Sequence, residues 1–530
     1  MKRTVITMML ACVAMFMTQC RKNDVQKPVG GETIDVTLVV DNGAKTEIDA
    51  DGIVTWKKGD KIHIVGATAG YLGYVTAEKD GDPVTFSGTI NYSPVTQVLH
   101  YYYVGSNDFL LDENGCYTFS VEKQDGTLDA IADKLQLMYS NSGYAVPGGT
   151  VDLGSTTMTT KNAIGGFSFT RTDGAPFVSG VQVTGAYTAM KFNAKTADFE
   201  HAEKTGTEDA IRVNKTTPGV YYFSFIPGQQ TLTFSQYVVF SEEFEKNIEE
   251  NKLYMAESPI AMSVSSDVPQ GALPGKFKVA EGKYVYFSKG NLYYNENETG
   301  AKWGFENYQW DYRSHPQKGG WSRETSESVI TTIAYSSSNP ALSSKGWGLF
   351  GYSTDKEGNY YGAMVSTTEN DYNGNFVDWG IAYCESNGIT PTTTWRTLEK
   401  SELKYLNDAT THKTSYYASF KLNYGSVDYT FPGFAYIPST IPADEMDVVK
   451  SDIKADLKKL ASYGAVFFPI TGRRYGDVQQ EPKHSYLRFK MNGDCNFLTC
   501  GANTSYNNGN FDYNGQVYLG GVVRLVYDVK

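Results

Sequence analysis

The 530-residue chain contains few cysteines and histidines, and its acidic residues outnumber the basic ones. With 6 Cys and 6 His, and without a His-Glu-x-x-His or Cys-x-x-Cys motif, the sequence predicts neither a metal site nor another cofactor. The 47 basic against 59 acidic residues give a net charge of −12. Nucleic acids and anionic membrane surfaces attract concentrated Lys and Arg, so this balance disfavours both as partners. After the first 20 residues, no apolar run approaches the length of a membrane span.

The first 20 residues have the features of an export signal. Two basic residues precede an apolar run over residues 5–17, which is too short to cross a bilayer, and Cys20 follows closely. This pattern resembles a bacterial lipoprotein signal peptide, in which Cys20 would become the lipidated N-terminus, although residues 17–19 depart from the usual lipobox. An ordinary secretory signal cleaved elsewhere is the alternative. In either case we expect the protein to be exported.

Glycine and aromatic residues are abundant and indicate a β-rich fold. The chain has 52 Gly, 39 Tyr and 27 Phe, and turn signals separate short alternating runs of β-branched and aromatic residues. Strands this short with turns this regular favour β-sandwiches. We therefore predict a mostly β protein.

The composition changes near residue 270, which indicates two kinds of domain. Six of the 7 tryptophans lie between residues 303 and 395, whereas the N-terminal half contains only Trp56. Residues 263–275 are short, polar and interrupted by Pro and Gly, as a linker would be. The predicted divisions are a signal peptide at 1–20, a flexible tether at 21–31, a β-sandwich region at 32–262, the linker at 263–275 and a C-terminal domain at 276–530.

Three ordered motifs characterise the N-terminal region: WKKGDKI, QDGTLDAIADKLQLMYS and YYFSFIPGQQTL. They resemble the fimbrillin-like domains of Bacteroidetes surface proteins. The resemblance covers about residues 32–262 and implies two stacked, transthyretin-like β-sandwich subdomains. Taken as residues, Trp56 is expected to be a core anchor and Gly59-Asp60 a tight turn, neither with a chemical role.

Further ordered motifs occur in the second half, among them GKYVYFSKGNLYY, WGFENYQWDY, TTTWRTLEKSELKYL and GGVVRLVYDVK. They resemble a C-terminal domain of many Bacteroidetes lipoproteins. That domain looks like a divergent C-type-lectin fold of the formylglycine-generating-enzyme type. The resemblance implies an α+β domain over about residues 275–530. Independently, the sequence predicts helices at 398–407, after Thr397, and at 446–462, ending near Gly464.

Cys495 and Cys500 are the strongest indication of an enzyme. An exported pair this close in sequence is a possible disulfide. In the formylglycine-generating oxidases, two cysteines at this spacing bind copper. The rest of that signature is not recognisable here, so we expect no enzyme, and the copper-dependent oxidase stays a remote alternative.

Residues 501–521 are crowded with Asn and Tyr before the closing VVRLV run. Such residues supply rigid amphipathic area and adaptable hydrogen bonds, as in antibody paratopes. In the retroelement-diversified lectin-like proteins, the variable ligand-binding face has the same position before the last strand. A polar surface loop without a function is the alternative. The candidate ligand-binding residues are Asn503, Tyr506, Asn507, Asn508, Asn510, Asp512, Tyr513, Asn514 and Tyr518.

Together these features predict a surface-exposed lipoprotein of the outer membrane. Its fimbrillin-like region would form a stalk, and its lectin-like domain would bind an extracellular glycan or a host or bacterial surface protein. Because a globular domain occupies the C-terminus, the expected role is a pilus tip or accessory adhesin, with other pilus subunits as further partners. A non-pilus surface lipoprotein for glycan capture is the alternative.

Overall fold

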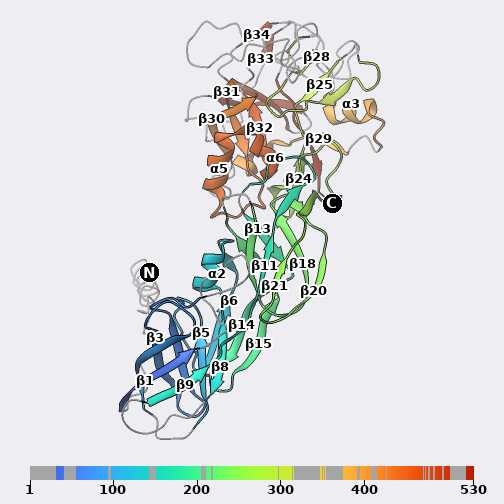
Figure 1. Ribbon diagram of the computed structural model, residues 1–530. Coiled ribbons are helices and arrows are strands. Elements are labelled where there is room, and N and C mark those ends of the chain that lie inside the picture. Colours follow the sequence, from blue (N-terminus) through green and yellow to red (C-terminus); the bar gives the residue numbers. More distant parts are fainter. Residues whose placement is uncertain are drawn as a thin grey trace, which may run out of the picture. The chain divides into compact units, whose positions relative to one another are not determined.

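The computed structural model describes the protein in two compact units (Figure 1). The described residues are 32–40, 55–92, 97–142, 151–178, 180–204, 210–215, 219–295, 298–312, 314–315, 346–348, 350, 353, 374–390, 394–407, 415–424, 427–469, 471, 473–475, 478–480, 484–491, 494–501 and 521–529.

The two units do not separate at a single point of the chain. Unit 1 comprises Met1–Thr170, Ser179–Gln236 and Ser241–Met262, and unit 2 comprises Arg171–Val178, Tyr237–Phe240 and Ser263–Lys530. Two short segments of the N-terminal half, 171–178 and 237–240, therefore belong to unit 2. We call them the inserted segments. The division of the chain differs from the predicted domain boundaries at these two places.

The first sheet of unit 1 encloses its own hydrophobic core. Its strand order is β10-β8-β5-β2-β3-β4-β1-β9. Buried side chains from nearly all of these strands form one cluster around Trp56, so the sheet must curl around that cluster. The strands are β1 (Thr33–Val40), β2 (Lys61–Gly66), β3 (Gly70–Ala77), β4 (Val84–Asn91), β5 (Leu99–Tyr103), β8 (Met138–Ser142), β9 (Val151–Thr156) and β10 (Thr159–Thr160).

A second sheet of unit 1 packs on the outer face of the first through aromatic rings. Its order is β15-β14-β6, with β6 (Cys116–Ser120), β14 (Tyr187–Asn193) and β15 (Asp198–Lys204). The ring of Phe192 in β14 lies 4.9 Å from that of Tyr102 in β5 and 4.9 Å from that of Phe199 in β15. The Tyr102 hydroxyl donates to the Ala194 carbonyl at 3.0 Å. The two sheets thus form a layered aromatic core.

The rest of unit 1 consists of shorter strands and one short helix. Helix α2 (Leu128–Lys134) begins at Thr127, whose hydroxyl accepts from the Ala130 N–H at 3.2 Å. One run of strands is β7-β16-β13-β18, with β20 beside β18, and another is β17-β11-β21. The strands are β7 (Lys123–Gln124), β11 (Ala163–Phe167), β13 (Val181–Thr184), β16 (Ile211–Val213), β17 (Tyr221–Phe225), β18 (Gly228–Gln236), β20 (Phe244–Ile248) and β21 (Leu253–Met255). Strand β12 (Phe169–Arg171) neighbours β22 (Ile260–Val264).

Unit 2 contains small sheets and several helices. One sheet has the order β23-β24-β37-β29, and it joins strands near the start of unit 2 to the last strand of the chain. The other sheets have the orders β26-β25-β28-β27, β30-β31-β32, β33-β34 and β35-β36. In addition, β19 (Val239–Phe240) pairs with the end of β22. The strands are β23 (Phe277–Ala280), β24 (Lys283–Phe287), β25 (Leu292–Tyr294), β26 (Trp303–Phe305), β27 (Ser314–His315), β28 (Gly346–Trp347), β29 (Trp395–Thr397), β30 (Ser415–Tyr424), β31 (Val427–Tyr436), β32 (Val466–Pro469), β33 (Arg473–Tyr475), β34 (Val478–Gln480), β35 (His484–Met491), β36 (Asp494–Gly501) and β37 (Leu525–Asp528). The helical elements are α3 (Trp379–Ser386), α4 (Lys400–Asn407), α5 (Met446–Ala455), η4 (Leu457–Lys459) and α6 (Leu460–Tyr463).

The tryptophans of unit 2 whose side chains the structure describes belong to its hydrophobic core. Trp303, Trp310, Trp379 and Trp395 are all buried, and they lie within the two hydrophobic clusters of the unit. Their rings therefore fill the core and are not presented to a ligand.

A buried carboxylate links several elements of unit 2. Glu402 of α4 receives two hydrogen bonds from Arg396 of β29, both 2.7 Å long, and it also pairs with Lys283 of β24 at 2.7 Å. Arg396 further pairs with Asp528 of β37 at 2.6 Å. These ion pairs connect β24, β37 and β29 of the β23-β24-β37-β29 sheet with α4.

The predicted linker at 263–275 is partly packed into unit 2. Leu273 is buried in its main cluster, and the Leu273 N–H donates to the Phe287 carbonyl at 2.7 Å. Gly275 lies so close to Gly464 that an added Cβ would stand 2.1 Å from the Gly464 carbonyl oxygen. The Pro and Gly residues of this segment thus permit close packing as well as turns.

The inserted segments contribute buried contacts to unit 2. Val178 is part of its main hydrophobic cluster. Arg171 donates to the Ser462 carbonyl at 3.0 Å, and the Tyr237 hydroxyl donates to Glu445 at 2.7 Å. Unit 2 is therefore completed by residues that precede position 263.

The prediction of a mostly β protein is confirmed. Within the described ranges, no helix combines the length and the apolar character needed to cross a bilayer.

Candidate functional site

The segment predicted to bind a ligand lies outside the described residues. This applies to Asn503, Tyr506, Asn507, Asn508, Asn510, Asp512, Tyr513, Asn514 and Tyr518, and also to the predicted lipidation site Cys20. The residues on both sides of the segment are described, and they define the frame to which it is attached.

The chain enters this segment from β36 and leaves it into buried structure. The Gly521 N–H donates to the Phe350 carbonyl at 2.9 Å, and the Phe350 N–H donates back to Gly521 at 2.8 Å. Val522 forms a parallel bridge with Leu487 of β35, and both residues are buried. From there the chain continues into β37 in the sheet that carries the Arg396 ion pairs. The described residues that follow position 520 are therefore packed against β35 and Phe350.

The possible disulfide between Cys495 and Cys500 does not form in this structure. Both residues lie in one strand, β36, opposite Lys490 and Ser485 of β35. Five residues of extended strand span about 16 Å, whereas a disulfide requires Cα atoms within about 7 Å of each other. Sequence spacing alone could not show that one continuous strand contains both cysteines.

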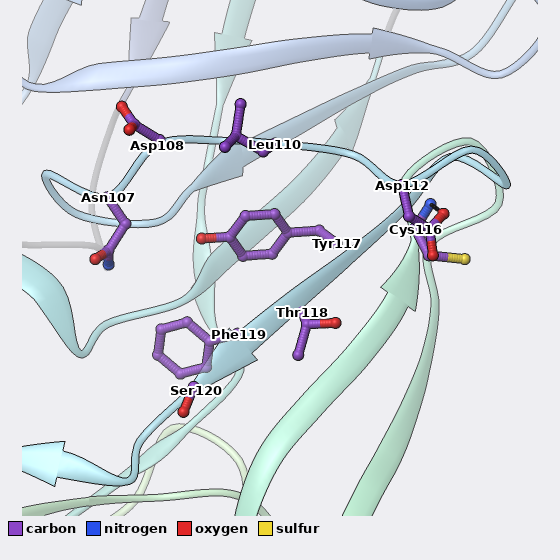
Figure 2. Close-up of a pocket in the computed structure, with 9 residues that line it drawn as sticks. All are labelled: Asn107, Asp108, Leu110, Asp112, Cys116, Tyr117, Thr118, Phe119 and Ser120. Carbon is purple, nitrogen blue, oxygen red and sulfur yellow. Dashed lines mark hydrogen bonds between the residues drawn. The ribbon is translucent and has the colours of Figure 1, made fainter. Parts of the chain in front are cut away.

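A second candidate site is a slot in unit 1, beside β6 (Figure 2). In Figure 2, β6 runs along one side and the preceding segment, residues 107–112, along the other. The slot has a volume of about 400 Å³, within the range of about 300–1,000 Å³ that is usual for ligand pockets. It is lined by Asn107, Asp108, Leu110, Asp112, Cys116, Tyr117, Thr118, Phe119 and Ser120.

The wall opposite β6 is fixed by Phe109. This buried ring stacks on His63 with a centroid distance of 4.6 Å and on Tyr117 with one of 5.0 Å. At the start of the same wall, the Asn107 side chain donates to the carbonyls of Val104, at 2.8 Å, and Lys134, at 2.6 Å. Ring stacking and hydrogen bonds therefore fix the position of this wall relative to β6.

The buried histidine behind this wall is neutral at physiological pH. Burial, and then the charge of Lys61, lower the pKa of His63 to about 3. Its Nδ1 lies 3.2 Å from the Tyr71 hydroxyl. His63 therefore supports the aromatic layer as an uncharged ring.

One end of the slot is closed by Asp112. The Asp112 N–H donates to the Cys116 carbonyl at 2.8 Å, and the Asp112 carboxylate accepts from the Cys116 N–H at 2.9 Å. The carboxylate also pairs with Lys191 at 3.0 Å. The hydrogen bond from Cys116 and the one from Lys191 lower the pKa of Asp112. The exposed Asp108 adds a second carboxylate to the rim.

The side chains that line the slot are mostly polar or acidic. The lining contains two carboxylates, one thiol and aromatic or small polar side chains, without His, Lys or Arg. Within the described parts of the chain, no group of three or more His, Cys, Asp or Glu could hold a metal ion.

Sequence reasoning missed this slot for a physical reason. The run from Asn107 to Ser120 shows turn residues followed by an alternating strand, which predicts a hairpin arm and no more. Which strand ends up at the edge of a sheet depends on pairing with β14, about 70 residues later in the chain.

No protein-family model matches this sequence, and no curated protein matches it. Solved structures show similarity over part of the chain. A "putative cell adhesion protein" from Bacteroides ovatus is 14% identical, with a TM-score of 0.29, and the match covers 45% of this chain and 97% of that one.

Two fimbrial proteins from Porphyromonas gingivalis are also similar. A fimbrilin is 15% identical with a TM-score of 0.24, and the match covers 40% of this chain and 72% of that one. A tip fimbrial protein is 5% identical with a TM-score of 0.24, and the match covers 41% of this chain and 82% of that one. The similar structures are thus cell adhesion and fimbrial proteins, each matched over less than half of this chain.

Proposed function

We propose that this protein is a surface-exposed lipoprotein of the outer membrane that acts as a pilus tip or accessory adhesin. In this proposal, residues 503–518 bind an extracellular glycan or protein, Cys20 carries the lipid anchor, and other pilus subunits are further partners. The protein has a binding role and no catalytic one.

The observation that carries the proposal is the frame around residues 502–520. The segment leaves β36 and returns at Gly521 and Val522, which are hydrogen-bonded and bridged to buried residues. Binding residues are commonly found on segments that a rigid scaffold carries, because the scaffold limits the entropy lost when a ligand binds. The Asn and Tyr content of the segment supplies hydrogen bonds and aromatic area for recognition.

One further feature supports the surface location. The N-terminal residues have the order expected of an export signal, with Cys20 at its end. A single acyl chain binds a membrane weakly, so we expect more than one acyl group on Cys20. The Cys20→Ser variant should therefore be released from cells. If this variant still sediments with outer membranes after a carbonate wash, the lipid anchor is wrong.

The binding role is tested with the released, full-length Cys20→Ser protein on an array of glycans and surface proteins. For a ligand found there, Tyr506→Ala and Tyr513→Ala should each weaken binding by about 1–3 kcal/mol, as truncation of aromatic anchors does. Tyr74→Ala is the matched control, because Tyr74 is also a surface tyrosine, 43% exposed, but lies in unit 1. Unchanged affinity in the Tyr506→Ala, Tyr513→Ala double variant would contradict the assigned segment.

A further inference from the structure

Among the strands that the structure describes, β6 at the side of the slot is an edge strand. In the three-strand order β15-β14-β6, β6 is terminal, and β14 pairs with it on one side only. A terminal strand presents a row of backbone N–H and C=O groups that another extended chain can complete. Which groups of β6 face the free side follows from its register.

The hydrogen bonds to β14 identify the residues that face outward. The Ala194 N–H donates to the Gly115 carbonyl at 2.9 Å, and the Val121 N–H donates to the Thr188 carbonyl at 2.8 Å. In an antiparallel pair, residues alternate between facing the partner strand and facing away from it. The register between these two bonds is continuous. Cys116, Thr118 and Ser120 therefore direct their backbone groups away from β14.

Among the described residues, only Cys116 of these three has hydrogen-bond partners for its outward backbone groups. Asp112 accepts from the Cys116 N–H and donates to its carbonyl, as in a short hairpin. Beyond this point the Phe109 ring of the preceding segment stacks on Tyr117 of β6, with centroids 5.0 Å apart. Among the described residues, no hydrogen bond is formed to the backbone of Thr118 or Ser120 on this side. The slot lies directly beside these two residues (Figure 2).

We propose that this slot binds an extended polypeptide segment, which adds to the β15-β14-β6 sheet as a further strand beside β6. Its backbone would pair with Thr118 and Ser120, at the spacing of about 4.8 Å between neighbouring strands. The five residues of β6 offer an edge of about 16 Å, enough for a short strand. The exposed side chain of Leu110, 41% accessible, would contact apolar residues on one face of the incoming segment.

Charge determines which segment fits. The rim carries Asp108 and Asp112, and a basic residue is present only as Lys191 beside Asp112. A segment with Lys or Arg at its ends therefore complements the slot. Two copies of this chain that paired through their β6 edges would bring the same carboxylates face to face, and the net charge of −12 adds to that repulsion. The occupant we assign is a basic, alternating apolar and polar segment of another protein.

The test uses the full-length Cys20→Ser protein and the fluorescein-labelled peptide Lys-Val-Thr-Val-Thr-Val-Lys. Binding is followed by fluorescence anisotropy, and the site is located by hydrogen exchange of residues 116–120. We expect saturable binding and slower exchange of this stretch. The same peptide with N-methyl groups on alternate residues should bind at least ten-fold more weakly, because it lacks the donors of a strand. A peptide with Glu in place of both Lys should bind about five- to ten-fold more weakly.

Matched variants separate the edge from the fold. Thr118→Pro removes an N–H that faces away from β14, so the β14 ladder is kept and peptide affinity should fall at least ten-fold. Thr118→Val changes the side chain at the same position and should bind like the parent protein. The N-methylated peptide gives the same information without altering the protein, so the test does not depend on the folding of Thr118→Pro.

Three outcomes would overturn the proposal. One is the absence of slower exchange at residues 116–120 with millimolar peptide of either charge. Another is equal affinity of the parent and N-methylated peptides, which would indicate side-chain contact without strand pairing. The third is a concentration-dependent dimer in sedimentation that Thr118→Pro abolishes, which would make a second copy the occupant of the slot.

Discussion

Individual residues show how burial sets the response of the protein to pH. His63 has an ordinary pKa of about 6.5 when unfolded and about 3 in the folded protein, where burial disfavours its charged form. Between these values the unfolded state binds the extra proton, so the free energy of unfolding falls as the pH falls. The largest slope from one such group is about 1.4 kcal/mol per pH unit.

We predict that His63→Phe makes unit 1 less sensitive to acid. The Phe ring can keep the stacking on Phe109, whose centroid lies 4.6 Å from that of His63. Urea unfolding at pH 7, 5.5 and 4.5 should show a smaller loss of stability in the variant than in the parent, since the carboxylates titrate in both proteins. If the unfolding free energies of the parent and the variant fell in parallel as the pH fell, His63 would be protonated in the folded state.

Glu402 is the corresponding charged residue of unit 2. Burial alone would raise its pKa, but the hydrogen bonds and charge of Arg396, followed by Lys283, lower it overall. Glu402→Gln leaves these two cations without their carboxylate and should cost about 2–3 kcal/mol of unfolding free energy. This loss of unfolding free energy is smaller than the loss on breaking a fully buried ion pair, because Arg396 keeps its ion pair with Asp528.

The control for Glu402→Gln is Glu281→Gln. Glu281 also pairs with a lysine, Lys278, at 2.9 Å, but its side chain is 90% exposed. Thermal unfolding should show little change in this variant. Equal melting temperatures for the two variants would contradict a structural role of the Glu402 cluster.

At the scale of elements, the sequence predicted helical faces better than helix boundaries. Residues 446–462 were predicted as one helix, and their apolar residues Val449, Ile453, Leu457 and Leu460 are all buried. The structure instead has α5, η4 and α6, because Asp456 is extended and accepts from the Lys458 N–H at 3.0 Å. Periodicity reports burial, whereas one capping side chain can interrupt a helix without changing the pattern.

The edge of β6 and the single strand through both cysteines depend on contacts distant in sequence. Trp56, by contrast, is buried at a bridge to Gly81, and Asp60 closes a turn onto Lys57, both as expected from local residue types. Local chemistry therefore predicted turns and core anchors. It could not predict strand neighbours, and hence neither the slot nor the position of the cysteines.

The predicted helix end at Gly464 allows a test at this scale. Gly464 has φ of +63°, and an added Cβ would lie 2.6 Å from Val238 and 2.7 Å from the Gly275 nitrogen. Gly464→Ala therefore combines backbone strain with a clash and should cost about 2–4 kcal/mol.

Gly282→Ala is the matched comparison for Gly464→Ala, because Gly282 has φ of +69° but nothing within 4 Å of an added Cβ. This variant should cost only the strain, about 1 kcal/mol. Denaturant unfolding measures both variants. Equal losses would show that close packing at Gly464 is unimportant.

At the scale of the whole molecule, the inserted segments make the two parts of the sequence interdependent. A polypeptide that begins at residue 263 lacks Arg171, Val178 and Tyr237, which contact Ser462, the main core and Glu445 of unit 2. Removing them exposes apolar surface and leaves polar groups of unit 2 without their partners. Unit 2 should therefore be studied within the full-length chain.

The last prediction concerns cleavage in the turns before Leu273. Cleavage at a protease site introduced at residues 265–270 would divide the chain into an N-terminal and a C-terminal product. The N-terminal product would still carry both inserted segments of unit 2. We therefore expect the two products to elute together from a sizing column in native buffer and to separate in urea. The Arg171→Ala, Tyr237→Ala double variant removes the bonds to Ser462 and Glu445, and its products should separate at lower urea concentrations. Products of the parent protein that separate freely in native buffer would show that the inserted segments are not held in unit 2.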